Sequence, residues 1–173
     1  MIEVNDESGY EPPIAGTEIT ELATFVLDEM RVHPQADLSV LLLDEAAMER
    51  LHLEWMNLPG PTDVMSFPMD ELRPAPLGEE PRPGMLGDIA VCPQVAARQA
   101  RRSGHATIEE VLLLVTHGIL HLLGFDHVEE TERKEMFALQ RRLLLTFLAN
   151  KQSAASGEAV SWDSLDDIAP TVD

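Results

Sequence analysis

The chain has 173 residues, of which 45% are apolar and 25% charged, which is the composition of one ordinary globular domain with its own core. Its formal net charge is −19, and this surplus of acids opposes partners that carry phosphate groups, so the composition does not favour DNA or RNA. A single cysteine, Cys92, excludes an internal disulfide. The first residues, MIEVNDESGYEPP, have neither the basic nor the apolar region of a signal peptide, and no long apolar run indicates a membrane partner. We therefore expect a soluble cytoplasmic protein.

The first part of the chain predicts strands that alternate with helices. Residues 2–4 form a short strand, and residues 17–30 have apolar side chains at helical spacing, with Thr17 as the N-cap. The apolar run LSVLLL at 38–43 predicts a buried strand. Asp44 then caps a second helix, which ends before the glycine and prolines of NLPGP.

The middle of the chain predicts two more strands that flank a loop. Residues 64–67 form a strand closed by Pro68, and residues 87–92 (GDIAVC) alternate as a strand does. Between them, the proline-rich segment 70–86 is expected to be a loop. A helix begins at Pro93 and ends near Gly104.

The last part of the chain predicts two helices and a tail. Thr107 and Glu110 have the spacing of a capping box, which opens a helix that ends at Gly124. A final helix covers about 130–149. The segment 151–173 is acidic and rich in small residues, so we expect a disordered tail. The order of elements in residues 1–150 fits one α+β or α/β layer structure, and we expect a single α+β domain with about four strands in a mixed sheet, about five helices and a metal site at the end of a helix.

Three of the six histidines, His117, His121 and His127, lie within eleven residues of the stretch THGILHLLGFDHV. His117 and His121 are four apart, so a helix places both imidazoles on one face. Gly124 lets the chain reverse, and His127 can then return to the same point. Three imidazoles with a fourth position open are typical of a catalytic zinc site, although nickel, cobalt or iron also accept such ligands.

The other three histidines, His33, His52 and His105, lie in separate elements, and we expect surface or structural roles for them.

The stretch from His117 to His127 also has the histidine and glycine spacing of zinc peptidases that carry H-E-x-x-H-x-x-G-x-x-H. However, Gly118 stands where those enzymes carry their general-base glutamate. Gly118 indicates either close packing of another element or open access beside the metal.

Three stretches together carry a family resemblance: HGILHLLGFDH at 117–127, PTDVMSFP at 61–68 and LGDIAVCP at 86–93. In these stretches the chain resembles the YbeY family of bacterial endoribonucleases, also called rRNA maturation factors, and the resemblance covers roughly residues 1–150. The N-terminal MIEVNDES and the segment WMNLPGPTDVMSFPMDE resemble the actinobacterial branch of the family.

The resemblance implies one α+β domain with one Zn²⁺ held by His117, His121 and His127. It also implies a metal-dependent endoribonuclease that prefers single strands and acts in ribosomal RNA maturation, at the 3′ end of small-subunit 16S rRNA, and in ribosome quality control. The implied partners are ribosomal RNA, the small ribosomal subunit and ribosome assembly factors.

The chain departs from the family pattern at one position. Many members carry an arginine a few residues before the P-T-[DN]-V motif, and Met56 occupies that place here. Arg73 or Arg82 of the proline-rich loop is the candidate to replace it in binding RNA. The segment QVAARQARRS at 94–103 carries three arginines: Arg98, Arg101 and Arg102. They form either a solvated helix face or a small patch that contacts phosphate.

The residues leave the mechanism open. The nucleophile is either a zinc-activated water, whose pKa falls toward about 7, or the 2′-hydroxyl of the RNA itself. Asp126 is a candidate to orient a ligand histidine, or else a turn residue, and Ser66 either lines the cleft or is an ordinary strand serine. Two other classes of function remain: a non-catalytic ribosome assembly factor stabilised by zinc, and a zinc peptidase, which the missing glutamate disfavours.

Overall fold

A computed structural model describes residues 1–70 and 72–156 of the chain. A four-stranded mixed sheet forms the centre, in the order β1 (Ile2–Glu7), β2 (Asp37–Leu43), β4 (Met85–Val91) and β3 (Val64–Pro68). The first three strands of this order are parallel, and β3 runs antiparallel to β4 at the edge. The two parallel pairs need crossover connections, which the intervening helices and loops provide.

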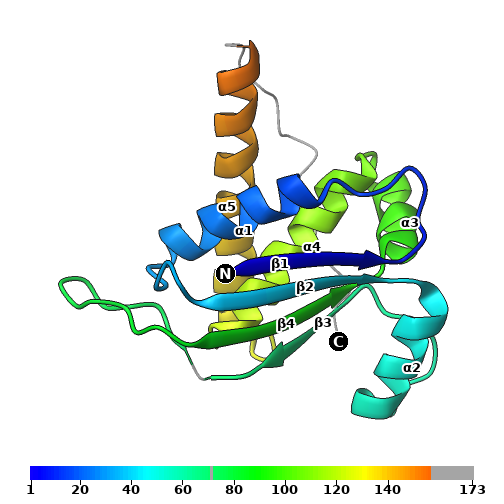
Figure 1. Cartoon of the computed structure of the whole chain (residues 1–173), viewed down its shortest axis with the longest axis horizontal. Helices are drawn as coiled ribbons and strands as arrows, with labels where there is room; N and C mark the ends of the chain where they lie inside the picture. The colour runs from blue at the N-terminus through cyan, green and yellow to red at the C-terminus, as the bar shows by residue number, and fades with distance from the viewer. Residues whose placement is uncertain (71, 157–173) are drawn as a thin grey trace.

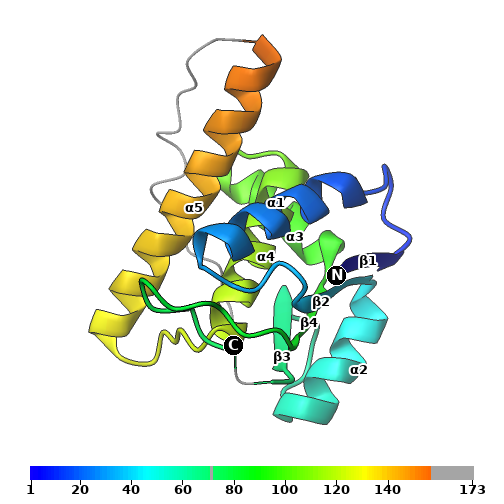
Figure 2. The same cartoon turned by 60° about the vertical axis from the view of Figure 1, so that its left-hand side comes forward.

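The described residues form five helices: α1 (Gly16–Glu29), α2 (Glu45–Met56), α3 (Pro93–Ser103), α4 (Thr107–Leu122) and α5 (Glu130–Ser156). Helices α1 and α4 pack against the sheet, and α3 and α5 pack against α4 (Figure 1). Helix α2 lies on the other face of the sheet, where its Met48 packs with Met65 and Ala90 (Figure 2). The expected α+β domain with four strands and five helices is confirmed for this part of the chain. No described helix is long and apolar enough to cross a membrane.

Helix α4 is the buried axis of the main core. Eleven consecutive residues, from Glu110 to Leu120, are buried in it. A helix that is apolar on all sides must be enclosed by other elements. The sheet, α1, α3 and α5 enclose α4 in this way. A second, smaller apolar cluster lies under α2 on the sheet and contains Met48 and Met65.

Gly118 brings α4 close to the sheet. A Cβ atom at this position would lie 3.0 Å from two side-chain carbons of Ile89 in β4. A larger residue would therefore push α4 away from β4. Of the two explanations for this mid-helix glycine, the structure supports close packing.

The expected caps of the first two helices differ in outcome. The Asp44 side chain accepts a hydrogen bond of 2.8 Å from the backbone N–H of Ala47, so its role as the N-cap of α2 is confirmed. Thr17 was expected to cap α1, but the helix already begins at Gly16, after Ala15. The Thr17 prediction is wrong because this residue lies inside the first turn.

The capping box predicted at the start of α4 is also wrong. Ala106 occupies the N-cap position and makes no side-chain capping bond, and Thr107 is the first residue of the helix. The Thr107 hydroxyl lies 3.3 Å from the hydroxyl of Tyr10, with which it forms a hydrogen bond. A tertiary contact therefore uses the group that was expected to cap the helix.

Three elements extend by two residues or more past their predicted bounds. Strand β1 extends to Glu7, and β4 begins at Met85, which shortens the expected loop. Helix α5 continues to Ser156, so the expected tail from 151 onward begins as helix. The Lys151 ammonium holds this end, because it contacts Glu18 at 3.0 Å and Glu21 at 3.2 Å on α1. Residues 157–173, the rest of the expected tail, lie outside the described residues, and the division into 1–150 and 151–173 stays a prediction.

Two buried carboxyl groups lie between β3, α3 and α4. Asp63 is 1% exposed and accepts hydrogen bonds from the backbone N–H of Val64 and from the Gln99 amide. Glu110 is 2% exposed. Burial raises the pKa of Asp63 to about 6. Burial, with a further contribution from Asp63, raises the pKa of Glu110 to about 7.

We expect these carboxyls to make the domain less stable as the pH rises. Their pKa values lie above the ordinary 3.8 and 4.5, so the folded state binds protons more tightly than the unfolded chain. The stabilisation is complete below about pH 4 and is lost as the pH passes through the two raised values. Glu110→Gln should flatten this fall in urea unfolding, while Glu109→Gln, which removes a partly exposed charge one residue away, should not. Equal pH profiles for both variants would contradict this expectation.

Candidate metal centre

The three histidines of the predicted triad meet at one end of α4. Each of the three imidazoles offers one ring nitrogen, and these three nitrogens lie within 4.8 Å of one another. The ring centroids of His117 and His121 are 4.6 Å apart, and that of His127 lies 5.0 Å from His121 and 5.5 Å from His117. One metal ion can therefore reach all three side chains.

Local backbone geometry explains how the sequence achieves this. His117 and His121 are one helical turn apart on α4. The helix ends in a Schellman motif, in which Gly124 N–H bonds to His121 O at 3.0 Å and Phe125 N–H bonds to Leu120 O at 3.0 Å. Gly124 adopts a φ of +97°, which favours glycine. The turn returns His127 to the side of the helix that carries the other two histidines.

Gln140 orients His117. This glutamine lies on α5, is 1% exposed, and its Oε1 atom is 2.7 Å from Nδ1 of His117. Because Oε1 only accepts, Nδ1 carries the proton and Nε2 presents a lone pair. The Nε2 atoms of His117 and His121 are both buried and have no hydrogen-bond partner. Unpaired buried ring nitrogens are costly unless a ligand satisfies them, so the residues fit a bound metal ion.

The surroundings keep the two helical imidazoles neutral. Burial, followed by the neighbouring His121, lowers the pKa of His117 to about 3. Burial, followed by the neighbouring His127, also lowers the pKa of His121. Neutral imidazole is the form that binds a metal, so no proton needs to be displaced at neutral pH.

Helix α5 adds an aromatic side to the centre. The ring of Phe137 stacks on His127, with centroids 6.1 Å apart and planes inclined by 23°. The Arg133 guanidinium lies 5.4 Å from the centroid of the same Phe137 ring. A cation therefore lies near the triad, over the ring of Phe137.

The two weak catalytic candidates make local contacts in the structure. The Asp126 carboxylate accepts a hydrogen bond of 2.7 Å from the backbone N–H of His127, as a turn residue does. Its charge opposes the lowering of the His121 pKa. The Ser66 hydroxyl donates to the carbonyl oxygen of Gly118 at 3.3 Å and so joins β3 to α4. Gln140, not Asp126, supplies the observed contact to a ring nitrogen of the triad.

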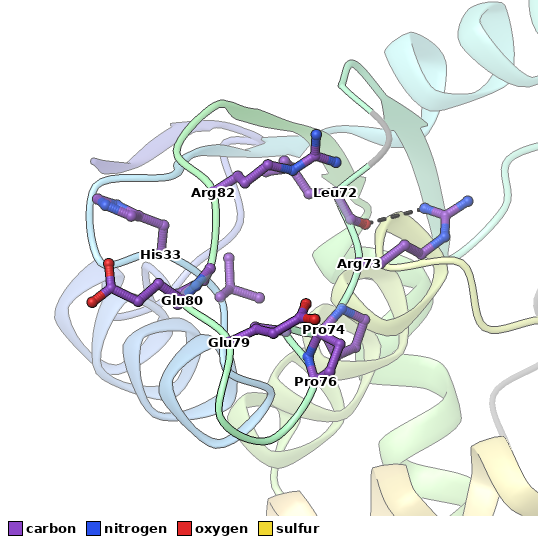
Figure 3. Close-up of a pocket in the computed structure, with 11 residues that line it drawn as sticks. His33, Leu72, Arg73, Pro74, Pro76, Glu79, Glu80 and Arg82 are labelled. Atoms are coloured by element: carbon purple, nitrogen blue, oxygen red, sulfur yellow. Dashed lines mark hydrogen bonds between the residues drawn. The ribbon is translucent and has the colours of Figure 1, made fainter.

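The two arginines of the proline-rich loop have different positions. They line a hollow of about 320 Å³ together with His33, Glu79 and Glu80. Figure 3 shows the Arg73 guanidinium pointing away from the hollow, while Arg82 lies on the opposite arm of the loop. A Cβ atom on Gly124 would lie 2.7 Å from Nε of Arg73. Arg73 therefore lies against the turn between His121 and His127.

The remaining positions singled out from the sequence lie in other parts of the fold. Met56 is the last residue of α2 and is 44% exposed. The ring of His52 bonds to Gly60 O at 2.9 Å, and His33 accepts from Gln35 N–H at 3.1 Å. A shallow hollow of about 430 Å³ is lined by three arginines of α3: Arg98, Arg101 and Arg102. Of these, Arg98 forms an ion pair with Glu45.

Sequence reasoning missed the contribution of α5 to this centre. Gln140 occupies a core-facing position among Met136, Leu139 and Leu143, where a polar residue is unusual and needs a buried partner. That signal was available in the sequence. The identity of its buried partner, His117, could not be predicted from the sequence, because the helical pattern does not show which element α5 packs against.

Residues 3–148 match the protein family described as Endoribonuclease YbeY. The chain belongs to this family. Among its relatives, the endoribonuclease YbeY of Kineococcus radiotolerans is 64% identical over 86% of this chain and 87% of its own. The endoribonuclease YbeY of Clavibacter sepedonicus is 57% identical over 87% of this chain and 97% of its own.

A solved structure shares the fold of this YbeY family member. The solution structure of a Thermotoga maritima protein superimposes with a TM-score of 0.61 at 26% identity, covering 92% of this chain and 97% of the other. The family resemblance expected from the histidine motif is thus confirmed over most of the chain.

We expect Gln140 to control the metal affinity of the triad. Gln140→Leu removes the acceptor for the His117 Nδ1 proton, so Zn²⁺ affinity should fall by about 10–100-fold. Gln140→Glu keeps an acceptor at the same place and should remain near wild type. Competition titration with a chromogenic chelator measures both. Equal affinity of Gln140→Leu and wild type would contradict the assignment.

Proposed function

We propose that this protein is a zinc-dependent endoribonuclease that cuts single-stranded RNA during ribosomal RNA maturation in the cytoplasm. The family assignment supports the reaction class, because the relatives are named endoribonucleases. The observation that carries the proposal is the triad of His117, His121 and His127, which has two unpaired buried ring nitrogens. We further propose 16S rRNA 3′-end processing and ribosome quality control as its role, with the small ribosomal subunit and assembly factors as partners.

The donor set favours one Zn²⁺ per chain. Three neutral imidazoles without a thiolate suit zinc, and three protein ligands leave a position for substrate or water. When bound, the zinc supplies Lewis-acid stabilisation of charge on a phosphate oxygen and a water of lowered pKa. The chain's own residues hold it: Gln140 fixes the tautomer of His117, and the Gly124 turn brings His127 to the helix.

Arg73 is the best-placed cation of the proline-rich loop to bind the scissile phosphate. It lies against Gly124, midway in sequence between His121 and His127. A guanidinium can form paired, charge-assisted hydrogen bonds to a phosphate. An arginine at the turn that carries His127 offsets the unfavourable net charge of −19 only locally, which fits a substrate held near its cleavage point.

A non-catalytic ribosome assembly factor is the second candidate. Two observations favour it: the strongly acidic composition, and Met56 at the place where many family members carry an arginine. In that case the metal only stabilises the fold. A zinc peptidase has less support, because Gly118 packs against Ile89 where a general-base glutamate would stand.

We expect one zinc per purified chain and RNA cleavage that a chelator abolishes. His127→Ala should lower the metal content and reduce cleavage to background, because it removes one of three ligands. Elemental mass spectrometry and a gel assay on single-stranded RNA measure these effects. His33→Ala, a histidine outside the triad, is the matched control and should retain both. Folded, zinc-loaded protein that does not cut RNA would favour the assembly factor, and cleavage of casein would favour the peptidase.

We also expect Arg73→Ala to lower kcat/KM for RNA about tenfold or more, the usual cost of losing a hydrogen bond between charged groups. Arg82→Ala should cost less, because it lies on the other arm of the loop. Zinc content should be unchanged in both variants. Full activity of Arg73→Ala would remove it from the proposed site.

A further inference from the structure

Arg31 ends α1 in an unusual conformation. It follows the C-cap Met30 and has a φ of +57°, in the left-handed region that glycine favours. Arg31 N–H bonds to Asp28 O at 3.1 Å, and Val32 N–H bonds to Leu27 O at 2.9 Å, which completes a Schellman motif. Gly124 fills the same position at the end of α4. An arginine in this conformation strains the backbone, so its side chain is the feature to explain.

The Arg31 side chain holds the proline-rich loop. Its Nε donates to Ala75 O at 3.0 Å, and one terminal nitrogen lies 3.3 Å from both Pro76 O and Glu79 O. The backbone contact is reciprocal, because Ala75 N–H donates to Arg31 O at 3.2 Å. One residue at the end of α1 thus binds the loop through four hydrogen bonds.

The held segment is stiff. Arg73 and Ala75 each precede a proline, which restricts their backbones to extended conformations, and Pro74 and Pro76 have fixed φ angles. Two side chains also anchor the loop in the interior, because Leu72 and Ala75 are both buried. A constraint on Ala75 therefore also restricts Arg73, two residues away.

Arg73 is the point where this loop meets the metal centre. Its Nε and Cζ atoms occupy the place where a side chain on Gly124 would begin, 2.7 and 2.8 Å from the position of a Cβ atom. The guanidinium accordingly lies on the backbone of the turn that carries His127. Figure 3 shows this side chain directed out of the loop.

We propose that Arg31 is a positioning residue for RNA cleavage: it fixes Ala75 and thereby holds the Arg73 guanidinium against Gly124, where it meets a phosphate of the RNA. This inference rests on the proposed function. A merely structural role would be to secure the end of α1, and glycine would serve that purpose better than arginine, because it adopts the left-handed conformation without strain.

That difference defines the experiment. Arg31→Gly removes the guanidinium and relieves the backbone, so it separates the loop contacts from helix stability. Arg31→Lys keeps the charge and one donor group but loses the planar fork. Arg73→Ala and the double variant Arg31→Gly/Arg73→Ala complete a double-mutant cycle, and Arg50→Ala, an exposed arginine on α2, is the control. The measurements are kcat, KM, zinc content and melting temperature for each protein.

We expect Arg31→Gly to lower kcat/KM by about threefold to thirtyfold, at unchanged zinc content and without a lower melting temperature. In the Arg73→Ala background the same change should cost less than about twofold, because Arg31 acts through Arg73. Arg31→Lys should fall between wild type and Arg31→Gly. Wild-type kcat/KM for Arg31→Gly, or an equal loss with and without Arg73, would overturn the proposal.

Hydrogen exchange separates this inference from the proposed function. The amides of the non-proline residues in 75–79 should exchange several-fold faster in Arg31→Gly, because the loop loses the three bonds that the guanidinium donates to its carbonyls. If wild-type protein does not cut RNA, the proposed function fails and Arg31 has no reaction to position, but faster exchange would still show that Arg31 holds the loop. If wild type cuts RNA and exchange is unchanged in Arg31→Gly, the positioning role alone fails.

Discussion

The burial of α4 is the constraint on which the metal centre depends. A helix that carries His117 at 0% exposure needs a partner for each ring nitrogen, and the core around it is apolar. Gln140 satisfies Nδ1, which leaves Nε2 of the same ring for a ligand. The packing that stabilises the domain therefore also fixes the tautomer and direction of a metal ligand, and the cost of burying an unpaired imidazole is offset when a metal binds.

Three glycine-favouring positions arrange the elements around that helix. Gly118 lets α4 lie against Ile89 of β4, and Gly124 turns the chain so that His127 rejoins the helix. The third, Arg31, is occupied by a residue with a long side chain, which extends from the end of α1 to the proline-rich loop. Gly124 and Arg31 end their helices by the same backbone motif, and the loop between β3 and β4 contacts both.

The net charge of the chain differs in sign from the charge of the arginine side chains that lie nearest the histidine triad. The chain carries −19 overall, yet Arg73 lies at the Gly124 turn and Arg133 lies over the Phe137 ring that stacks on His127. At physiological salt, charges more than about 8 Å apart are largely screened, so the distant acids weigh less on a substrate than these two cations. The buried pair Asp63 and Glu110, with raised pKa values, carries less negative charge near neutral pH than its composition implies.

The sequence by itself determined the α+β class, the four strands and five helices, and the meeting of His117, His121 and His127. These follow from local rules: apolar periodicity, the four-residue spacing on a helix, and a glycine that ends it. Only the tertiary structure decided that Gln140 faces His117, that Arg73 rather than Arg82 lies at the turn, and that Thr107 bonds to Tyr10 instead of capping α4. Each of these contacts joins residues distant in the chain, and the packing of whole elements, not local spacing, sets which ones meet.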